Sequence, residues 1–230
     1  FSLLEAHTAS AMADAPDSGS QAVAIASLLD KRDAILALIP RLLQQGRGTL
    51  CERVHGDFHL GQVLVTPGDV FIIDFEGEPA RTMDERRRKR NPLRDVAGLL
   101  RSFDYASAVV ARAPDATVPA AGANPIAGPS VDTVAQRRDI LLERFRVEAS
   151  GAFLEAYREV AASAPRPWVD SKDEEALLAL FLIEKAAYEV SYEAANRPAW
   201  IGVPLRGLVT LAGRIEPAIR KEEDLDGQQP

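Results

Sequence analysis

Apolar side chains recur at helical spacing along most of this chain. In five segments they return every three or four positions, which predicts helices over residues 21–45, 93–111, 134–162, 174–196 and 205–220. The first of these patterns stops at Gly46, a residue type that often ends helices. Pro40 lies within it and should kink or divide the helix.

A different pattern occupies the region between the first two helices. Residues 62–65 and 70–73 are predicted to pair as strands, because the Pro67-Gly68 centre of the connection favours a tight turn. The polar segment 13–20, with its aspartates, proline and glycine, is typical of a loop. The expected fold class is therefore mainly α with a small β-hairpin element.

Three features bear on domain organisation. Residues 113–132 are rich in proline, glycine and alanine, which predicts a flexible surface insertion, and the polar residues 222–230 predict a frayed tail. The remainder reads as one unit covering residues 1–230. Because the sequence starts at Phe1 in what looks like the middle of a helix, we expect it to be part of a longer protein.

Composition narrows the function classes. The chain is 47% hydrophobic and has a formal net charge of -7, which favours a globular protein and disfavours general nucleic-acid binding. No long uncharged apolar run or secretory signal is present, so we expect a cytoplasmic protein without a membrane partner. Cys51 is the single cysteine and offers neither a disulfide nor a zinc cluster, in agreement with a reducing compartment.

Two polar motifs flank the predicted hairpin. The first is His-Gly-Asp-Phe-His-Leu-Gly-Gln at residues 55–62, and the second is Ile-Asp-Phe-Glu-Gly-Glu-Pro at residues 73–79. Phosphoryl transfer from ATP needs a carboxylate near the acceptor hydroxyl and oxygen ligands that hold Mg²⁺ on the phosphates. Asp57, Gln62 and Asp74 could supply these groups, because the hairpin brings the motif ends together. The alternative is that the two aspartates merely cap loops.

These motifs resemble the catalytic loop and the metal loop of the protein-kinase-like superfamily, in its aminoglycoside phosphotransferase branch. Two further runs, which start at Pro92 and Tyr188, resemble blocks of the maltokinase family, as do the first two. The four blocks lie in the same order as in that family and span about residues 53–211. Maltokinases are often fused to trehalose synthase.

The resemblance implies the C-terminal lobe of an aminoglycoside-phosphotransferase-like fold, with ATP and Mg²⁺ as cofactors. The implied reaction is transfer of the ATP γ-phosphate to the anomeric hydroxyl of maltose or a related sugar, giving maltose 1-phosphate in trehalose and glycogen metabolism. A trehalose synthase domain is the implied protein partner. By position, Asp57 matches the catalytic aspartate and Asp74 the metal-loop aspartate. Gln62 matches a metal ligand that is asparagine in the wider superfamily.

Three other residues near these motifs have competing interpretations. His55 and His59 surround Asp57 in a spacing that could suit a metal-dependent hydrolase, but only His7 remains elsewhere, so we favour structural support of the loop. Asp95 either hydrogen-bonds the catalytic loop, as the resemblance implies, or is an ordinary carboxylate in the first turn of a helix.

Acceptor recognition is expected from the last long helix and the segment after it. Aromatic and carboxylate side chains recur there at a spacing of four, which suits sugar binding, although core tyrosines with exposed glutamates would give the same pattern. The candidate residues are Tyr188, Glu189, Tyr192, Glu193, Asn196, Arg197 and Trp200. The basic run at residues 86–90 is interpreted as a solvated surface rather than a nucleic-acid site.

A kinase of this class also needs a glycine-rich strand loop and a strand lysine on the phosphates. Before Asp57 the only lysine is Lys31, in a predicted helix, so the ATP-gripping N-terminal lobe is expected to be absent and the chain alone to phosphorylate poorly or not at all. Other hypotheses remain open at this stage. They are an aminoglycoside or other small-molecule phosphotransferase, a non-catalytic kinase-like interaction domain, and a metal-dependent hydrolase.

Overall fold

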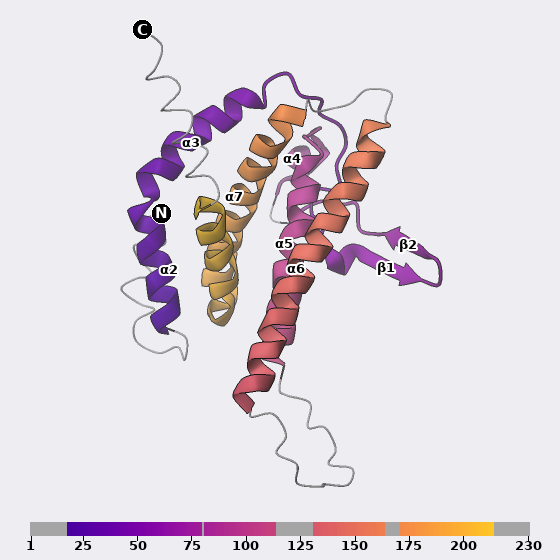
Figure 1. The fold of residues 1–230 in the computed structure, drawn as a ribbon. Helices are drawn as coiled ribbons and strands as arrows, with labels where there is room; N and C mark the ends of the chain where they lie inside the picture. The colour runs from indigo at the N-terminus through magenta and orange to yellow at the C-terminus, as the bar shows by residue number, and fades with distance from the viewer. Residues whose placement is uncertain (1–17, 80, 114–130, 164–170, 214–230) are drawn as a thin grey trace. The chain divides into compact units, whose positions relative to one another are not determined.

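The computed structural model describes residues 18–79, 81–113, 131–163 and 171–213. Figure 1 shows a mostly helical chain with a two-stranded hairpin, which confirms the predicted fold class. In chain order the elements are α2 (Ser18–Asp30), α3 (Arg32–Gln45), the 3-10 turn η1 (Leu60–Gln62), β1 (Val63–Thr66), β2 (Asp69–Ile72), α4 (Met83–Arg87), α5 (Leu93–Arg112), α6 (Val131–Ala162), α7 (Ser171–Asn196), the 3-10 turn η2 (Pro198–Trp200) and a helix over residues 202–213.

The chain divides into two compact units, and α5 contributes to both. The first unit comprises Phe1–Arg101 and Trp168–Pro230, and the second comprises Ser102–Pro167. Within the second unit, the ring of Phe103 on α5 meets that of Phe145 on α6 edge to face, with the ring centres 6.1 Å apart. Both motifs that suggested chemistry lie in the first unit.

The core of the first unit joins α2 to α7 and to the segment that follows α7. Its buried side chains are Ile25 and Leu28 of α2, Val190 of α7, and Ile201 and Leu205 that follow. Each fully buried aliphatic side chain contributes about 1.5–3 kcal/mol of transfer free energy. The helix over residues 174–196 was therefore correctly predicted as a packed element, although α7 begins three residues earlier, at Ser171.

The first predicted helix is in fact two helices, and the break lies at Lys31 rather than at Pro40. Pro40 lies inside α3, so the prediction that it could divide the helix is wrong. Leu38 and Leu42, on either side of the proline, are buried, and this packing outweighs the loss of one backbone hydrogen bond. The end at Gly46 is confirmed. A side chain there would meet Leu177 of α7 at 2.5 Å, so glycine permits the close approach of α3 to α7.

The hairpin agrees with its prediction to within one residue. β1 and β2 are antiparallel, with Val63 opposite Ile72 and Thr66 opposite Asp69. Gly68 in the turn has a φ of 84°, a conformation that glycine adopts without strain.

Several predicted boundaries need correction or lie outside the described residues. Residues 18–20 are the start of α2 rather than loop, and residues 131–132 belong to α6 rather than to an insertion. The rest of the predicted insertion, residues 114–130, and the predicted tail, residues 222–230, lie outside the described residues. Among the helices that are described, none is long and apolar enough to cross a membrane.

The short helix α4 was not predicted. It begins with a capping box in which the Thr82 hydroxyl accepts a hydrogen bond from the Glu85 N–H at 3.3 Å, and the Glu85 carboxylate accepts one from the Thr82 N–H at 2.9 Å. This reciprocal pair satisfies two backbone donors at a helix start. It therefore orders the basic segment that follows the second motif.

Candidate functional site

The loop that carries Asp57 is held in place by α5. Asp95 of α5 accepts hydrogen bonds from the backbone N–H groups of His55 at 2.6 Å and Gly56 at 2.9 Å. Burial raises the pKa of Asp95, although the two N–H donors oppose that effect. These are the contacts that a loop-bracing role of Asp95 requires.

A second contact between α5 and the loop depends on a glycine. A side chain at Gly98 would come within 2.5 Å of the backbone oxygen of Phe58, so α5 can lie against the loop only because residue 98 has no Cβ. Residue 98 is also one turn after Asp95. The position of Asp57 therefore follows from two adjacent turns of one helix.

The two histidines make structural contacts. The buried His55 has its Nε2 atom 2.7 Å from the backbone oxygen of Ile73, and its ring packs against Phe75, with ring centres 4.8 Å apart. It thus connects the first motif to the second. His59 accepts a hydrogen bond from the Gly61 N–H at 3.1 Å and so caps η1.

Gln62 and Asp74 lie side by side at the base of the hairpin. The Gln62 amide donates to Asp74 Oδ2 at 3.1 Å, and the Ile73 N–H donates to the Gln62 backbone oxygen at 3.0 Å. Asp74 has a φ of 63°, which is uncommon for a residue other than glycine and occurs often at functional sites. The hairpin therefore brings together two of the side chains that the sequence suggested as ligands.

This pair fits a magnesium ion. Mg²⁺ is usually held by one or two protein side chains together with substrate phosphates, and a carboxylate and an amide at hydrogen-bond distance can share one ion if the amide oxygen turns inward. Within the described parts of the chain, no group of three or more His, Cys, Asp or Glu residues could hold a metal. The ligand set of a metal-dependent hydrolase is therefore not found in those parts.

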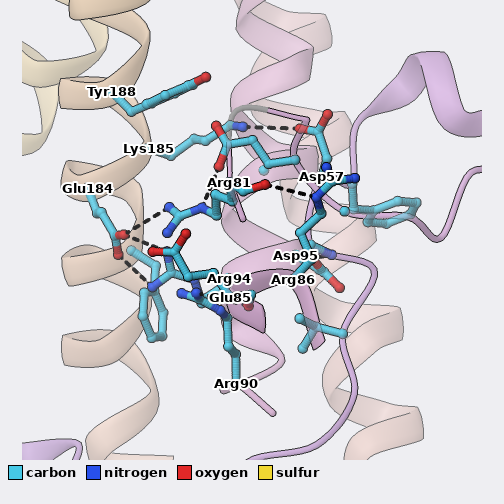
Figure 2. A pocket seen from close by; sticks show the side chains of 17 residues that line it. Asp57, Arg81, Glu85, Arg86, Arg90, Arg94, Asp95, Glu184, Lys185 and Tyr188 are labelled. Atoms are coloured by element: carbon cyan, nitrogen blue, oxygen red, sulfur yellow. Dashed lines mark hydrogen bonds and ion pairs between the residues drawn. The ribbon is translucent and has the colours of Figure 1, made fainter. Parts of the chain in front are cut away.

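Asp57 faces a pocket between its loop and α7. Its Oδ1 atom lies 3.5 Å from the Lys185 ammonium, and that ammonium lies 5.5 Å from the centre of the Tyr188 ring (Figure 2). Glu78 and Arg81, from the segment after the hairpin, also line the pocket. The pocket therefore combines carboxylates, cations and an aromatic face.

Charged neighbours shift the pKa values of two lining residues. Burial raises the pKa of Glu78, but hydrogen bonding to Arg81 and Tyr188 and the charge of Lys185 outweigh it, so the net pKa is below its ordinary value. Burial and then interaction with Glu78 raise the pKa of Tyr188 to about 12. Glu78 is thus ionised and Tyr188 protonated near neutral pH.

Two arginines of the basic run lie in the pocket wall rather than in solvent. Arg86 donates to the backbone oxygen of Arg81 at 3.0 Å, and Arg90 donates to that of Glu85 at 3.3 Å. The interpretation of residues 86–90 as a solvated surface is therefore wrong for these two, because both side chains line the pocket. The three residues between them are exposed, as expected.

The suggested acceptor segment separates into two groups. The carboxylates of Glu189 and Glu193 are buried in ion pairs, at 2.7 Å with Arg101 and 2.6 Å with Arg197. Both carboxylates therefore have arginine partners, and neither glutamate is the exposed one of the alternative interpretation.

The aromatic residues of the segment are more accessible. Tyr188 and Tyr192 are 36% and 44% exposed, and their rings are stacked with centres 6.3 Å apart. Arg197 lies over the rings of both Tyr192 and Trp200. Asn196 donates to the Tyr192 backbone oxygen at 2.9 Å and so caps the end of α7.

The sequence interpretation missed Lys185, Glu78 and Arg81. Lys185 is 128 positions from Asp57, a separation at which no local pattern operates. One signal was available, since Lys185 precedes Tyr188 by three positions on a helix already suspected of binding the acceptor. Glu78 and Arg81 belong to the second motif and its immediate continuation.

Known proteins similar to this chain were found by sequence and by structure, whereas no protein-family model matches it. A glucosamine kinase of Streptacidiphilus jiangxiensis is 31% identical over 165 residues, which are 71% of this chain and 32% of that protein. A glucosamine kinase of Mycolicibacterium smegmatis (strain ATCC 700084 / mc(2)155) is 29% identical over 157 residues, 68% of this chain and 33% of that protein.

Solved structures agree with the sequence comparison. A glucosamine kinase in complex with glucosamine, ADP and inorganic phosphate has a TM-score of 0.63 at 25% identity, over 91% of this chain and 42% of that one. Crystal form A of a glucosamine kinase gives a TM-score of 0.64 at 25% identity, over 95% and 46% of the two chains. The chain spans about a third of the length of the curated relatives it matches. It thus has a kinase-like fold and is similar, in sequence and in structure, to part of the glucosamine kinases.

Proposed function

We propose that this chain carries the catalytic loop and the acceptor side of an ATP-dependent sugar kinase. The observation that supports this most directly is the placement of Asp57. Its carboxylate lies in a pocket, on a loop braced by Asp95, while Gln62 and Asp74 pair at the base of the adjoining hairpin. A base and a pair of cation ligands on one rigid support are what phosphoryl transfer requires.

The chemistry follows from these positions. Asp57 accepts the proton of an acceptor hydroxyl while that oxygen forms a bond to the γ-phosphorus of ATP. The bond from this phosphorus to the bridging oxygen breaks, and its electron pair leaves with ADP. Gln62 and Asp74 would hold Mg²⁺, which neutralises charge on the phosphates. Asp95 and His55 keep the loop from shifting during the transfer.

We place the chain in the C-terminal lobe of such a kinase. This placement is supported by the two motifs and by coverage of less than half of each solved kinase. In the described ranges, no glycine-rich loop joins two strands, and β1 and β2 contain no lysine. ATP would then be gripped largely by residues outside this chain, and the chain alone should transfer phosphate poorly.

Glucosamine or a related amino sugar is the first candidate acceptor. The relatives found by sequence and structure are glucosamine kinases. In this chain, the ionised Glu78 and the neighbouring Asp57 side chain with the face of Tyr188 suit a protonated amino sugar, because acidic groups pair with its ammonium and aromatic faces contact its C–H surface.

Maltose is the second candidate. The resemblance of four sequence blocks to maltokinases supports it, as do the exposed, stacked rings of Tyr188 and Tyr192 with the partly buried Trp200 nearby, which would suit a neutral disaccharide. A trehalose synthase partner belongs to this candidate alone. The two candidates therefore differ in acceptor charge, and a substrate panel separates them.

The test is a phosphorylation assay on the full-length protein with ATP and Mg²⁺. Glucosamine, maltose, glucose and an aminoglycoside are compared by ADP release and by the mass of the phosphorylated product. Asp57→Asn should lower transfer by about a hundred- to ten-thousand-fold, since the amide cannot accept a proton. Asp33→Asn, on the exposed surface of α3, is the matched control and should leave transfer unchanged.

Two results would overturn the proposal. Near wild-type transfer by Asp57→Asn would remove the assigned base. If ADP release did not depend on any sugar, amino sugar or aminoglycoside, the chain would not provide the acceptor side of a sugar kinase. A hydrolase, in contrast, would release phosphate from a substrate without ATP and would lose bound metal together with activity.

A further inference from the structure

Lys185 is the side chain that contacts the carboxylate of Asp57. Its ammonium lies 3.5 Å from Oδ1, and the two side chains are only 28% and 25% exposed. Oδ2 makes no hydrogen bond with any residue that the structure describes. Because the pair is largely shielded from water, its attraction is screened less than that of a surface pair. One carboxylate oxygen is thus held and the other is left open.

The lysine is held in place by ion pairs on both sides of it. The preceding residue, Glu184, accepts two hydrogen bonds from Arg94, one of them at 2.8 Å. Four residues after the lysine, Glu189 accepts hydrogen bonds from Arg101 at 2.9 Å and 2.7 Å. Paired donors from a planar guanidinium fix both distance and direction. The segment of α7 around Lys185 therefore has a defined position relative to α5.

The same helix fixes the other partner. Asp95 and Gly98 of α5 hold the loop of Asp57, through the hydrogen bonds to its backbone and the close approach to Phe58. The backbones that carry Lys185 and Asp57 are thus both positioned by α5. The separation of Lys185 from Asp57 is therefore set by the contacts that α7 and the loop of Asp57 each make with α5.

Further contacts define where the ammonium points. It lies over the face of Tyr188, 5.5 Å from the ring centre, a cation–π arrangement that stabilises a partly desolvated cation. Its charge also lowers the pKa of Glu78, and Asp57 and Glu78 both act on Tyr188. The ammonium thus lies near two carboxylates. Without it, these like charges would repel each other across the pocket.

We propose that Lys185 is a positioning residue for Asp57. By holding Oδ1, it presents Oδ2 to the acceptor hydroxyl, and Oδ2 receives the proton as the acceptor oxygen bonds to phosphorus. Lys185 itself exchanges no proton and forms no bond in this step. This inference rests on the proposed kinase function, and it adds the residue that orients the base.

The test uses Lys185→Met in the full-length protein. The neutral side chain keeps most of the volume but frees Asp57 to rotate, and misplacement of a reacting group by about 1 Å can cost on the order of a hundredfold in rate. We expect kcat to fall by about ten- to a hundredfold while KM for ATP stays within about twofold. Lys185→Arg, which keeps the charge, should recover a large part of kcat. Lys89→Met, at an exposed lysine, is the matched control.

A double-mutant cycle separates positioning from a direct action on the phosphates. In the Asp57→Asn background, Lys185→Met should cause no further loss, because the group that it orients is already inactive. A full additional loss would overturn the proposal and would show that the ammonium acts on the transferred phosphoryl group.

Three other outcomes have distinct meanings. Wild-type kcat in Lys185→Met would also overturn the positioning role. If Asp57→Asn alone kept its activity, the kinase proposal would fail, and this result is read before any Lys185 variant is interpreted. Melting temperatures are measured for every variant, and a kcat loss in Lys185→Met that Lys185→Arg did not reverse, with equal melting temperatures, would contradict the inference.

Discussion

Removing Arg101 from its buried ion pair with Glu189 should destabilise the protein far more than breaking an exposed pair of the same length. Arg101 is 2% exposed, and its guanidinium reaches Glu189 at 2.7 Å. The comparison pair, Arg144 with Glu148, also has a separation of 2.7 Å, but its side chains are 69% and 62% exposed. The two pairs differ in burial, and also in that the first joins α5 to α7 whereas the second is local to α6.

The expected magnitudes follow from burial. Arg101→Met removes the guanidinium that pairs with the buried Glu189 carboxylate, and breaking a buried pair in this way costs about 3–5 kcal/mol. Arg144→Met breaks an exposed pair, which is worth about 0–1 kcal/mol. For a protein of about 150–250 residues, one kcal/mol corresponds to about 2–4 °C in Tm. The first variant should therefore lose about 6–20 °C and the second at most about 4 °C.

Thermal unfolding followed by circular dichroism measures both variants under one set of conditions. The double variant Arg101→Met with Glu189→Leu should regain much of the lost stability, because no buried charge is left unpaired. If Arg101→Met lost no more than Arg144→Met, the burial argument would be refuted. If Glu189→Gln raised KM for the sugar at unchanged Tm, Glu189 would be an acceptor ligand after all.

Three further predictions concern single residues. The pKa of Glu78 lies below its ordinary 4.5. The ionised side chain therefore stabilises the folded state above pH 4.5, and this stabilisation is lost as the pH falls through the lowered pKa. Glu78→Gln should therefore lose less stability than the wild type on acidification, as measured by urea unfolding from neutral to acidic pH. Gly98→Ala should lower kcat by displacing Phe58. Gly151→Ala, which has open space around it, should leave kcat unchanged and stabilise α6 by about 0.5–1 kcal/mol. Steady-state kinetics and unfolding of both variants measure these effects. Asp74→Asn tolerates the same backbone conformation but lacks the charge of a proposed Mg²⁺ ligand, so the Mg²⁺ concentration for half-maximal activity should rise by at least about 10- to 100-fold, the loss found when only a residue that supports a metal ligand is changed.

The helices and the hairpin were predictable because their apolar spacing is strong and local. Boundaries were less accurate where polar residues take part in a helix, as at the starts of α6 and α7. Pro40 misled because its effect on a helix depends on what the flanking leucines pack against, which is a tertiary property. The short α4 carried a readable capping signal in Thr82 and Glu85, but a five-residue helix has no apolar period to confirm it.

Separation along the chain also explains which site residues the sequence indicated. Gln62 and Asp74 could be placed together because a two-residue turn joins the strands between them, and they lie 3.1 Å apart. Lys185 could not be placed, since its distance from Asp57 is set by ion pairs between α5 and α7. The glutamates of α7 were assigned to the sugar from their spacing together with the resemblance to maltokinases. Their burial depends on arginines that the spacing does not reveal.

The left-handed backbone of Asp74 affects how this site should be dissected by mutation. Alanine scanning assumes that truncation removes a side chain and nothing else. Aspartate already carries a Cβ at this φ of 63°, and its short polar side chain tolerates the conformation better than alanine does, so a loss of function in Asp74→Ala would mix added backbone strain with the loss of a carboxylate. Glycine removes the side chain without that strain, and asparagine keeps a similar side-chain shape. Alanine and glycine at this position then compare the backbone with and without a Cβ when no carboxylate is present, and the difference between asparagine and aspartate reports the charge.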